Sequence, residues 1–131
     1  MKYTCFDLKI NNKIAHLSMC RPDEFNSMNK AFWSELPALI EKISDEASAR
    51  VIVLSGQGKH FCAGMDLANF GNVDEKPKAH LGMRKEFAYR VLLDLQHTIS
   101  CIEKARIPVI AALQGACVGG GVYLATATDF R

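Results

Sequence analysis

The sequence contains no long apolar run, and none approaches the roughly 20 residues that a membrane span needs. It also lacks an excess of charge of one sign. The 131 residues carry a formal net charge of +2, which argues against attachment to nucleic acid by bulk electrostatics. The first residues show no apolar stretch with a small-residue cleavage site, so we expect no secretory leader. We therefore predict a globular, cytoplasmic protein without a nucleic-acid or membrane partner.

Several short motifs are missing as well. The five cysteines are scattered and form no CxxC pair, which argues against a disulfide framework and against a zinc site. No G-K-[ST] motif of a phosphate-binding loop is present. The glycine run near residue 120 lacks the full G-x-G-x-x-G spacing with an acidic residue further on, so a dinucleotide site is poorly supported. We expect neither a metal nor a redox cofactor.

The patterns that are present predict an α/β chain in the order strand, strand, helix, strand, loop, helix, strand, helix. The expected segments are a hairpin at 3–9 and 13–19, a helix after Asn29, a strand at 50–56, a loop at 71–80, a long amphipathic helix at 81–105, a strand at 107–113 and a helix from about 120. Asn29 is a candidate helix cap, whereas Pro37 should kink this helix or delay its start. The nearly all-apolar strand at 50–56 suggests a sheet covered on both faces.

Two apolar strands run through glycines into helices, at "GQGKHFCAGMDL" and at "QGACVGGGVYL". Helix N-termini expose unpaired N–H groups. Two such ends that converge offer two N–H donors to one oxygen, an arrangement that stabilises an oxyanion or enolate. A single glycine-rich turn is usually structural. The occurrence of two related junctions favours the functional interpretation.

The motifs "HFCAGMDL" and "IPVIAALQGACVGGGVYLATATDFR", preceded by "RPDEFNSMN", resemble the enoyl-CoA hydratase/isomerase family, or crotonase superfamily. The form of the glycine run is similar to the dienoyl-CoA isomerase-like branch. The resemblance implies one domain over residues 1–131 with a crotonase-like ββα spiral core. It also implies that the chain is truncated before the C-terminal strands and helical region of the family.

By this resemblance, a thioester carbonyl binds between the backbone N–H groups of Met65 and Gly120. A side chain at Gly120 would crowd the thioester. Asp66 has a second interpretation, as the cap of a short helix that begins at Leu67. The implied substrate-binding residues are Asp23, Glu24, Phe25, Asn26, Ser27, Met28, Ala63, Gly64, Asp66, Leu67 and Gly119. Basic candidates for the coenzyme A phosphates are Lys13, Arg21, Lys59 and His60.

The sequence departs from the family at Tyr123, where hydratases carry glutamate and dienoyl-CoA isomerase-like members carry aspartate. A phenol is protonated at neutral pH and is a poor general base, so Tyr123 is either a catalytic participant or a packing residue at the pocket edge. The second catalytic carboxylate of the family has no counterpart in the sequence.

The resemblance implies an acyl-CoA-binding enzyme of the lyase or isomerase class in fatty acid metabolism. It needs no cofactor besides the coenzyme A thioester that is its substrate, and it forms a homo-oligomer, a trimer or hexamer, when intact. The 131 residues alone are expected to be inactive. The alternatives are a non-catalytic acyl-CoA-binding or assembly subunit and an inactive fragment.

Overall fold

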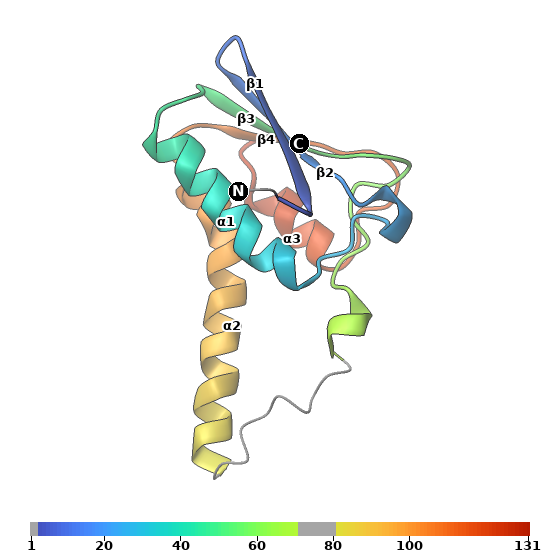
Figure 1. The fold of residues 1–131 in the computed structure, drawn as a ribbon, viewed down its shortest axis with the longest axis vertical. Helices are drawn as coiled ribbons and strands as arrows, with labels where there is room; N and C mark the ends of the chain where they lie inside the picture. The colour runs from blue at the N-terminus through green and yellow to red at the C-terminus, as the bar shows by residue number, and fades with distance from the viewer. Residues whose placement is uncertain (1–2, 71–80) are drawn as a thin grey trace.

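The computed structural model describes residues 3–70 and 81–131, and it has a layer of strands above a layer of helices (Figure 1). The expected order of strands and helices is confirmed. The elements are β1 (Phe6–Asn11), β2 (Ile14–Met19), η1 (Pro22–Glu24), α1 (Lys30–Asp45), β3 (Val51–Gly56), η2 (Leu67–Phe70), α2 (Leu81–Lys104), β4 (Val109–Ala112) and α3 (Gly120–Ala127). The fold class is therefore the predicted α/β class.

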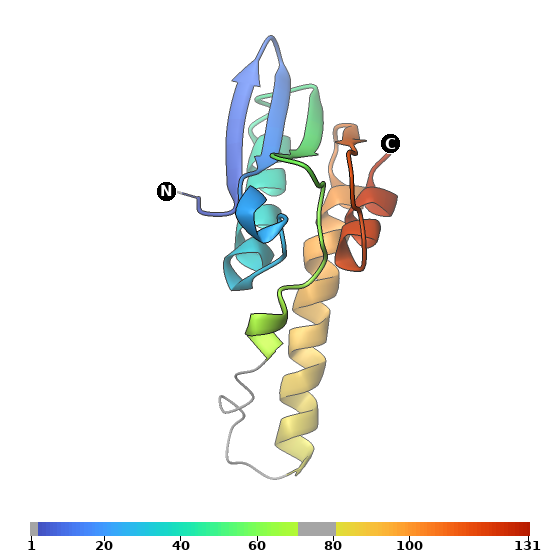
Figure 2. The same cartoon turned by 90° about the vertical axis from the view of Figure 1, so that its right-hand side faces the viewer.

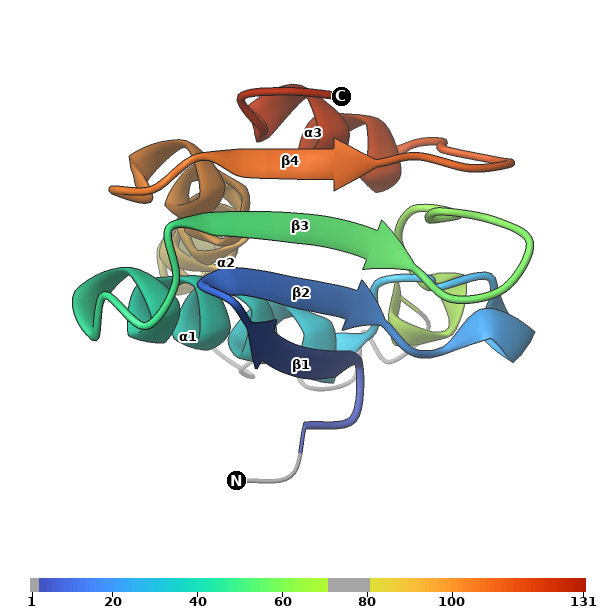
Figure 3. The same ribbon diagram turned by 90° about the horizontal axis from the view of Figure 1, so that it is seen from above.

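The strands form one sheet in the order β1-β2-β3-β4, which Figure 3 shows face-on. Strands β1 and β2 pair antiparallel as the expected hairpin, and β2, β3 and β4 run parallel. The hairpin turn places Asn12 and Lys13 at φ values of 49° and 65°. Two successive residues with positive φ match the twist of the adjoining strands.

The sheet buries one face. Along β3, Ile52 and Leu54 are fully buried, whereas Val51 and Val53, which alternate with them, are partly exposed. Helices α1 and α2 lie behind the sheet in Figure 3, on the side that receives the buried residues. The expectation of a sheet covered on both faces is therefore wrong for the described part of the chain, because β-branched residues occupy the outward positions of β3 as well as the inward ones.

Helix α1 begins where expected. The side chain of Asn29 accepts a hydrogen bond of 3.0 Å from the N–H of Phe32 and caps the first turn. Pro37 nevertheless lies inside the helix, so the prediction of a late start is wrong. A proline at this position leaves the carbonyl of Trp33 without its helical donor. The hydroxyl of Thr98 on α2 lies 3.0 Å from that carbonyl and 3.0 Å from the carbonyl of Asp94, so it shares one proton between them and replaces the missing bond in part.

Helix α2 is buried only toward its C-terminal end, where Thr98, Cys101 and Ile102 reach the core. Its N-terminal half extends away from the sheet in both side views (Figures 1 and 2). Phe87 and Val91 are 47% and 41% exposed, so the apolar face expected along the whole helix is covered over its second half alone. Residues 71–80, expected as a loop, lie outside the described residues. Among the described helices, none is long and apolar enough to cross a membrane.

Candidate functional site

The two strand–glycine–helix junctions lie side by side. Cys62 and Cys117 form a parallel β-bridge between them. The N–H of Phe61 donates to the carbonyl of Gln114 at 2.8 Å, and the N–H of Val118 donates to the carbonyl of Cys62 at 3.1 Å. These bonds fix the position of one junction against the other, as the sequence pattern suggested.

Glycines permit this close approach, each for its own reason. A side chain at Gly64 would place its Cβ 3.0 Å from the carbonyl oxygen of Val118 and 3.2 Å from the nitrogen of Gly120. Gly119 is the N-cap residue of α3 and has a φ of 54° with a ψ of −123°, a conformation that residues with a Cβ rarely adopt. A Cβ at Gly121 would lie 2.8 Å from the carbonyl oxygen of Cys62. At Gly120 a Cβ would meet the movable thioether of Met28.

The N–H groups of Met65 and Gly120 donate no hydrogen bond to any atom of residues 3–70 or 81–131. Their neighbours do: the N–H of Asp66 donates to Met28, and the N–H of Gly121 donates to Val118. Gly120 is the first residue of α3, so its N–H points out of the helix end. The two backbone donors named from the sequence are therefore both available to a ligand.

Met65, Gly120 and Tyr123 line one cavity of about 520 Å³. The remaining lining residues come from α1 and α2: Trp33, Leu92, Leu95, Gln96, Ile99 and Ser100. The lining contains no carboxylate within the described residues. The cavity thus offers two unpaired N–H donors beside a largely apolar wall. The ring of Tyr123 belongs to that wall, and its side chain is 67% exposed.

Sequence reasoning did not assign the α1 and α2 residues to the site. Leu95 and Ile99 belong to the apolar face of the amphipathic helix predicted at 81–105, and an apolar face is also what a cavity wall requires. The apolar spacing of the helix after Asn29 includes Trp33 in the same way. No signal in the sequence showed that the two helices leave space between them and α3.

The early loop (residues 21–29) packs against the first junction (residues 56–67). The carbonyl of Phe25 accepts from the N–H of Ala63 at 3.0 Å, and the N–H of Met28 donates to the carbonyl of Gly64 at 2.8 Å. Asn26 and Met28 are buried, at 2% and 1% exposure. These hydrogen bonds therefore join the early loop to the segment that contains Met65.

The remaining loop side chains differ in exposure. Asp23, Glu24 and Phe25 are exposed, and Ser27 is partly buried. Leu67 is 82% exposed. The part that these residues and the buried ones take in substrate binding stays a prediction.

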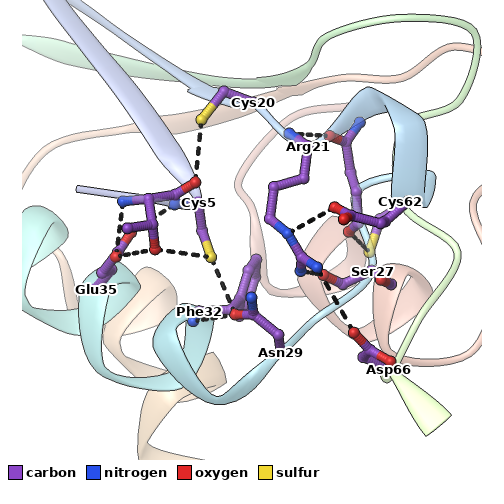
Figure 4. Close-up of polar contacts among 12 residues, drawn as sticks. Cys5, Cys20, Arg21, Ser27, Asn29, Phe32, Glu35, Cys62 and Asp66 are labelled. Atoms are coloured by element: carbon purple, nitrogen blue, oxygen red, sulfur yellow. Dashed lines mark hydrogen bonds and ion pairs between the residues drawn. The ribbon is translucent and has the colours of Figure 1, made fainter. Parts of the chain in front are cut away.

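Arg21 connects the loop to Asp66 (Figure 4). Its guanidinium donates to the carbonyl of Ser27 at 2.7 Å and lies 2.9 Å from Glu24 and 3.6 Å from Asp66. Two carboxylates thus neutralise the cation, which makes it a weak candidate for a coenzyme A phosphate. The other carboxylate oxygen of Asp66 accepts from the N–H of Ala68 at 3.0 Å, so the alternative role of Asp66 as a helix cap is observed.

All five cysteines are free. Burial raises the pKa of the Cys62 thiol, which donates to the carbonyl of Asn26 at 3.2 Å. Burial also raises the pKa of Cys101 to about 12. Both thiols are therefore protonated near neutral pH and poorly nucleophilic. No group of three His, Cys, Asp or Glu side chains in the described ranges is arranged to hold a metal ion.

The family model for enoyl-CoA hydratase/isomerase matches residues 9–131. A mitochondrial Delta(3,5)-Delta(2,4)-dienoyl-CoA isomerase of Pongo abelii is 42% identical over 119 residues, which are 90% of this chain and 36% of that protein. A peroxisomal enzyme of the same name from Arabidopsis thaliana is 37% identical over 123 residues, covering 92% of this chain and 44% of its own length.

Comparison with solved structures identifies the same family. The crystal structure of an enoyl-CoA hydratase from Bacillus anthracis is 31% identical, with a TM-score of 0.81 over 98% of this chain and 46% of that one. The chain therefore spans less than half the length of these relatives.

One expectation is corrected by these relatives. The prediction of a cytoplasmic location is wrong, because the relatives from Pongo abelii and Arabidopsis thaliana are mitochondrial and peroxisomal enzymes. The scattered cysteines and the composition of the first residues, from which the prediction came, do not distinguish the cytoplasm from a mitochondrion or a peroxisome. The family model, the curated relatives and the solved structures agree with one another: the chain belongs to the enoyl-CoA hydratase/isomerase family, the crotonase superfamily, and resembles its dienoyl-CoA isomerases.

Proposed function

We propose that the protein binds an acyl-CoA thioester and polarises its carbonyl between the N–H groups of Met65 and Gly120. When a proton leaves the carbon next to the carbonyl, the electron pair moves onto the thioester oxygen and forms an enolate. Two fixed N–H donors stabilise this charge more strongly than they stabilise the neutral carbonyl, which accelerates the step. The reaction class is hydration or double-bond migration in an enoyl or dienoyl thioester.

A single observation carries the proposal. The two N–H groups are unpaired within the described residues although their neighbours are paired, and Met65 and Gly120 are both lining residues of the cavity of about 520 Å³. Met65 and Gly120 are partly exposed, and the first N–H groups of a helix have no partner within the helix, so both donors can bind an oxygen of a ligand. The apolar wall from α1 and α2 suits an acyl chain.

No carboxylate lines the cavity in the described part of the chain, so the proposal assigns carbonyl polarisation to this site and assigns it no base. Tyr123 contributes a phenol to the wall, which donates a hydrogen bond at neutral pH. The names of the relatives favour an enzyme over a purely acyl-CoA-binding subunit, and double-bond isomerisation over hydration. The family resemblance also implies a homo-oligomer, which light scattering of the purified protein tests.

The test compares turnover of a 3,5-dienoyl-CoA and of crotonyl-CoA by the intact protein, as wild type and as Gly120→Val, because the 131 residues alone are expected to be inactive. A valine at residue 120 would displace the donor and fill the space beside it, so turnover should fall by about 100-fold or more. Gly82→Val is the matched control, since a Cβ at Gly82 meets no atom within 4 Å. Normal turnover by Gly120→Val would refute the donor assignment. Thioester binding without any turnover by the wild type would favour the non-catalytic subunit.

A further inference from the structure

His60 lies between the early loop and the second junction. Its ring is 5.5 Å from that of Phe25, centroid to centroid, at an interplanar angle of 65°. On its other side, the N–H of Ala116 donates to Nδ1 of His60 at 3.0 Å. The imidazole therefore contacts one residue from each of the two segments that flank the first junction.

The bond to Ala116 defines the state of the imidazole. A backbone N–H can only donate, so Nδ1 must be unprotonated and the ring proton must lie on Nε2. The carbonyl of Ala116 is also occupied, because it accepts from the N–H groups of Phe61 and Cys62 at 3.1 Å and 3.2 Å. Both backbone polar groups of Ala116, its N–H and its carbonyl, are therefore hydrogen-bonded to residues 60–62.

Gly115 shows that the second junction is shaped around this histidine. A Cβ on Gly115 would lie 2.7 Å from Nδ1 of His60 and would overlap the carbonyl oxygen of Lys59. The backbone can approach the imidazole this closely because residue 115 has no side chain. From Ala116 the chain runs through Val118, which pairs with Cys62, to Gly120. The position of Ala116 is therefore transmitted to one of the two proposed donors.

We propose that His60 is a positioning residue: its Nδ1 atom holds the second junction, and through it the N–H of Gly120, in register with the N–H of Met65. The effect on catalysis rests on the function proposed above, whereas the hydrogen bond itself does not. If His60 only packed against Phe25, its Nδ1 atom would not need to accept a hydrogen bond. A substitution that keeps the ring but removes the acceptor therefore distinguishes a packing role from a positioning role.

The experiment uses two substitutions that each keep one property. His60→Asn keeps an acceptor near the place of Nδ1 but loses the ring, and His60→Phe keeps the ring against Phe25 but loses the acceptor. Hydrogen exchange of the Ala116 amide is measured by NMR, together with the 15N shifts of the wild-type imidazole. His16→Asn is the control, because His16 lies exposed on β2. Circular dichroism melting verifies that each variant is folded.

We expect the wild-type ring to carry its proton on Nε2. Exchange at Ala116 should accelerate about tenfold or more in His60→Phe and remain near the wild-type rate in His60→Asn. Turnover of the dienoyl-CoA, measured with the same substitutions in the intact protein, should follow the same order, with the loss in kcat rather than in KM. A proton on Nδ1, or equal exchange in wild type and His60→Phe, would overturn the proposal. Equal acceleration in both variants would also overturn it and would reduce His60 to a packing residue.

Absence of turnover in the wild type would count against the proposed function, while the exchange rates would still decide the role of His60. A wild type that is active, with His60→Phe exchanging fast at Ala116 but turning over normally, would separate the hydrogen bond from catalysis. That result would contradict the positioning role.

Discussion

The side-chain amide of Asn26 donates a hydrogen bond of 2.9 Å to the carbonyl oxygen of His60, which ties the early loop to the first junction. The same nitrogen donates to the carbonyl of Gln57 at 2.9 Å, and the amide oxygen accepts from the N–H of Arg21 at 3.0 Å. Asn26 is 2% exposed. The family resemblance implies that Asn26 contacts the substrate. In the structure its side chain instead makes three hydrogen bonds to backbone groups of the protein.

Asn26→Ala should lower the free energy of unfolding by about 2–4 kcal/mol, because it leaves three backbone groups unpaired in a buried place. Asn26→Asp should be worse still, since it sets a carboxylate oxygen against two carbonyl oxygens while sparing the bond to Arg21. Urea denaturation measures both. An Asn26→Asp protein as stable as the wild type would show that the two carbonyl contacts are unimportant.

Thr98 and Pro37 should be coupled. Thr98→Val removes the donor to the carbonyl of Trp33 and should cost about 1–2 kcal/mol. In a Pro37→Ala background the new N–H of residue 37 can reach that carbonyl within the helix, so the same Thr98→Val change should cost less. A double-mutant cycle measures the interaction energy. Additive effects of the two substitutions would mean that the hydroxyl does not replace the helical bond.

Local features of the fold could be predicted from the sequence, whereas contacts between distant segments could not. The hairpin, the cap at Asn29 and the paired junctions are local or nearly local, so residue type and spacing were sufficient to indicate them. Pro37 is tolerated through a donor more than 60 residues away in sequence, at Thr98, and no local pattern contains that fact. The cavity wall at Trp33 and Leu92 likewise depends on how two helices pack. The outward valines of β3 led to the wrong prediction of a sheet covered on both faces, because β propensity does not distinguish the two faces of a sheet.

The neighbours Gly120 and Gly121 should respond in opposite ways to alanine. At Gly121 the Cβ would lie 2.8 Å from a backbone oxygen, so Gly121→Ala should destabilise the fold by about 1–3 kcal/mol. At Gly120 the Cβ would meet only the flexible end of Met28, so Gly120→Ala should fold nearly normally but lose thioester turnover. Thermal unfolding and kinetics on the same preparations test this. Greater instability of Gly120→Ala would contradict the steric argument.

Cys101 should contribute to stability in a pH-dependent way. Burial raises its pKa from an ordinary 9.0 to about 12 in the folded protein. The protonated thiol is therefore favoured by the fold: its contribution is fully present below pH 9 and is lost as pH rises toward 12. The stability difference between wild type and Cys101→Ala should shrink by about 1.4 kcal/mol per pH unit in this range.

Cys117→Ala is the control for this titration. Its thiol is partly exposed, so the corresponding difference should change less over the same range. Denaturation at a series of alkaline pH values measures both differences. A wild-type to Cys101→Ala difference that stays constant through pH 11 would mean that the thiol ionises in the folded state as it does in the unfolded state.

The proposed function predicts that Tyr123 limits which reaction the site performs. It lines the cavity beside Gly120, in a place where the hydratase pattern requires glutamate. A phenol cannot share with a second carboxylate the task of activating water, so hydration of crotonyl-CoA by the wild type should be slow. Tyr123→Glu introduces the missing carboxylate next to the two N–H donors. Because the side chain is 67% exposed, the substitution should disturb the fold little.

Hydration should therefore rise in Tyr123→Glu, by about tenfold or more if the new carboxylate acts on water. Tyr123→Phe separates the loss of the hydroxyl from the gain of the carboxylate, and its rate should stay close to that of the wild type. Steady-state hydration of crotonyl-CoA by the intact protein, as wild type, Tyr123→Glu and Tyr123→Phe, makes the comparison. Fast hydration by wild type and Tyr123→Phe alike would show that no carboxylate is needed at this position. A large loss in Tyr123→Phe would instead identify the phenol as a group that acts on the substrate, because deleting one hydroxyl leaves the apolar ring and the backbone donors in place.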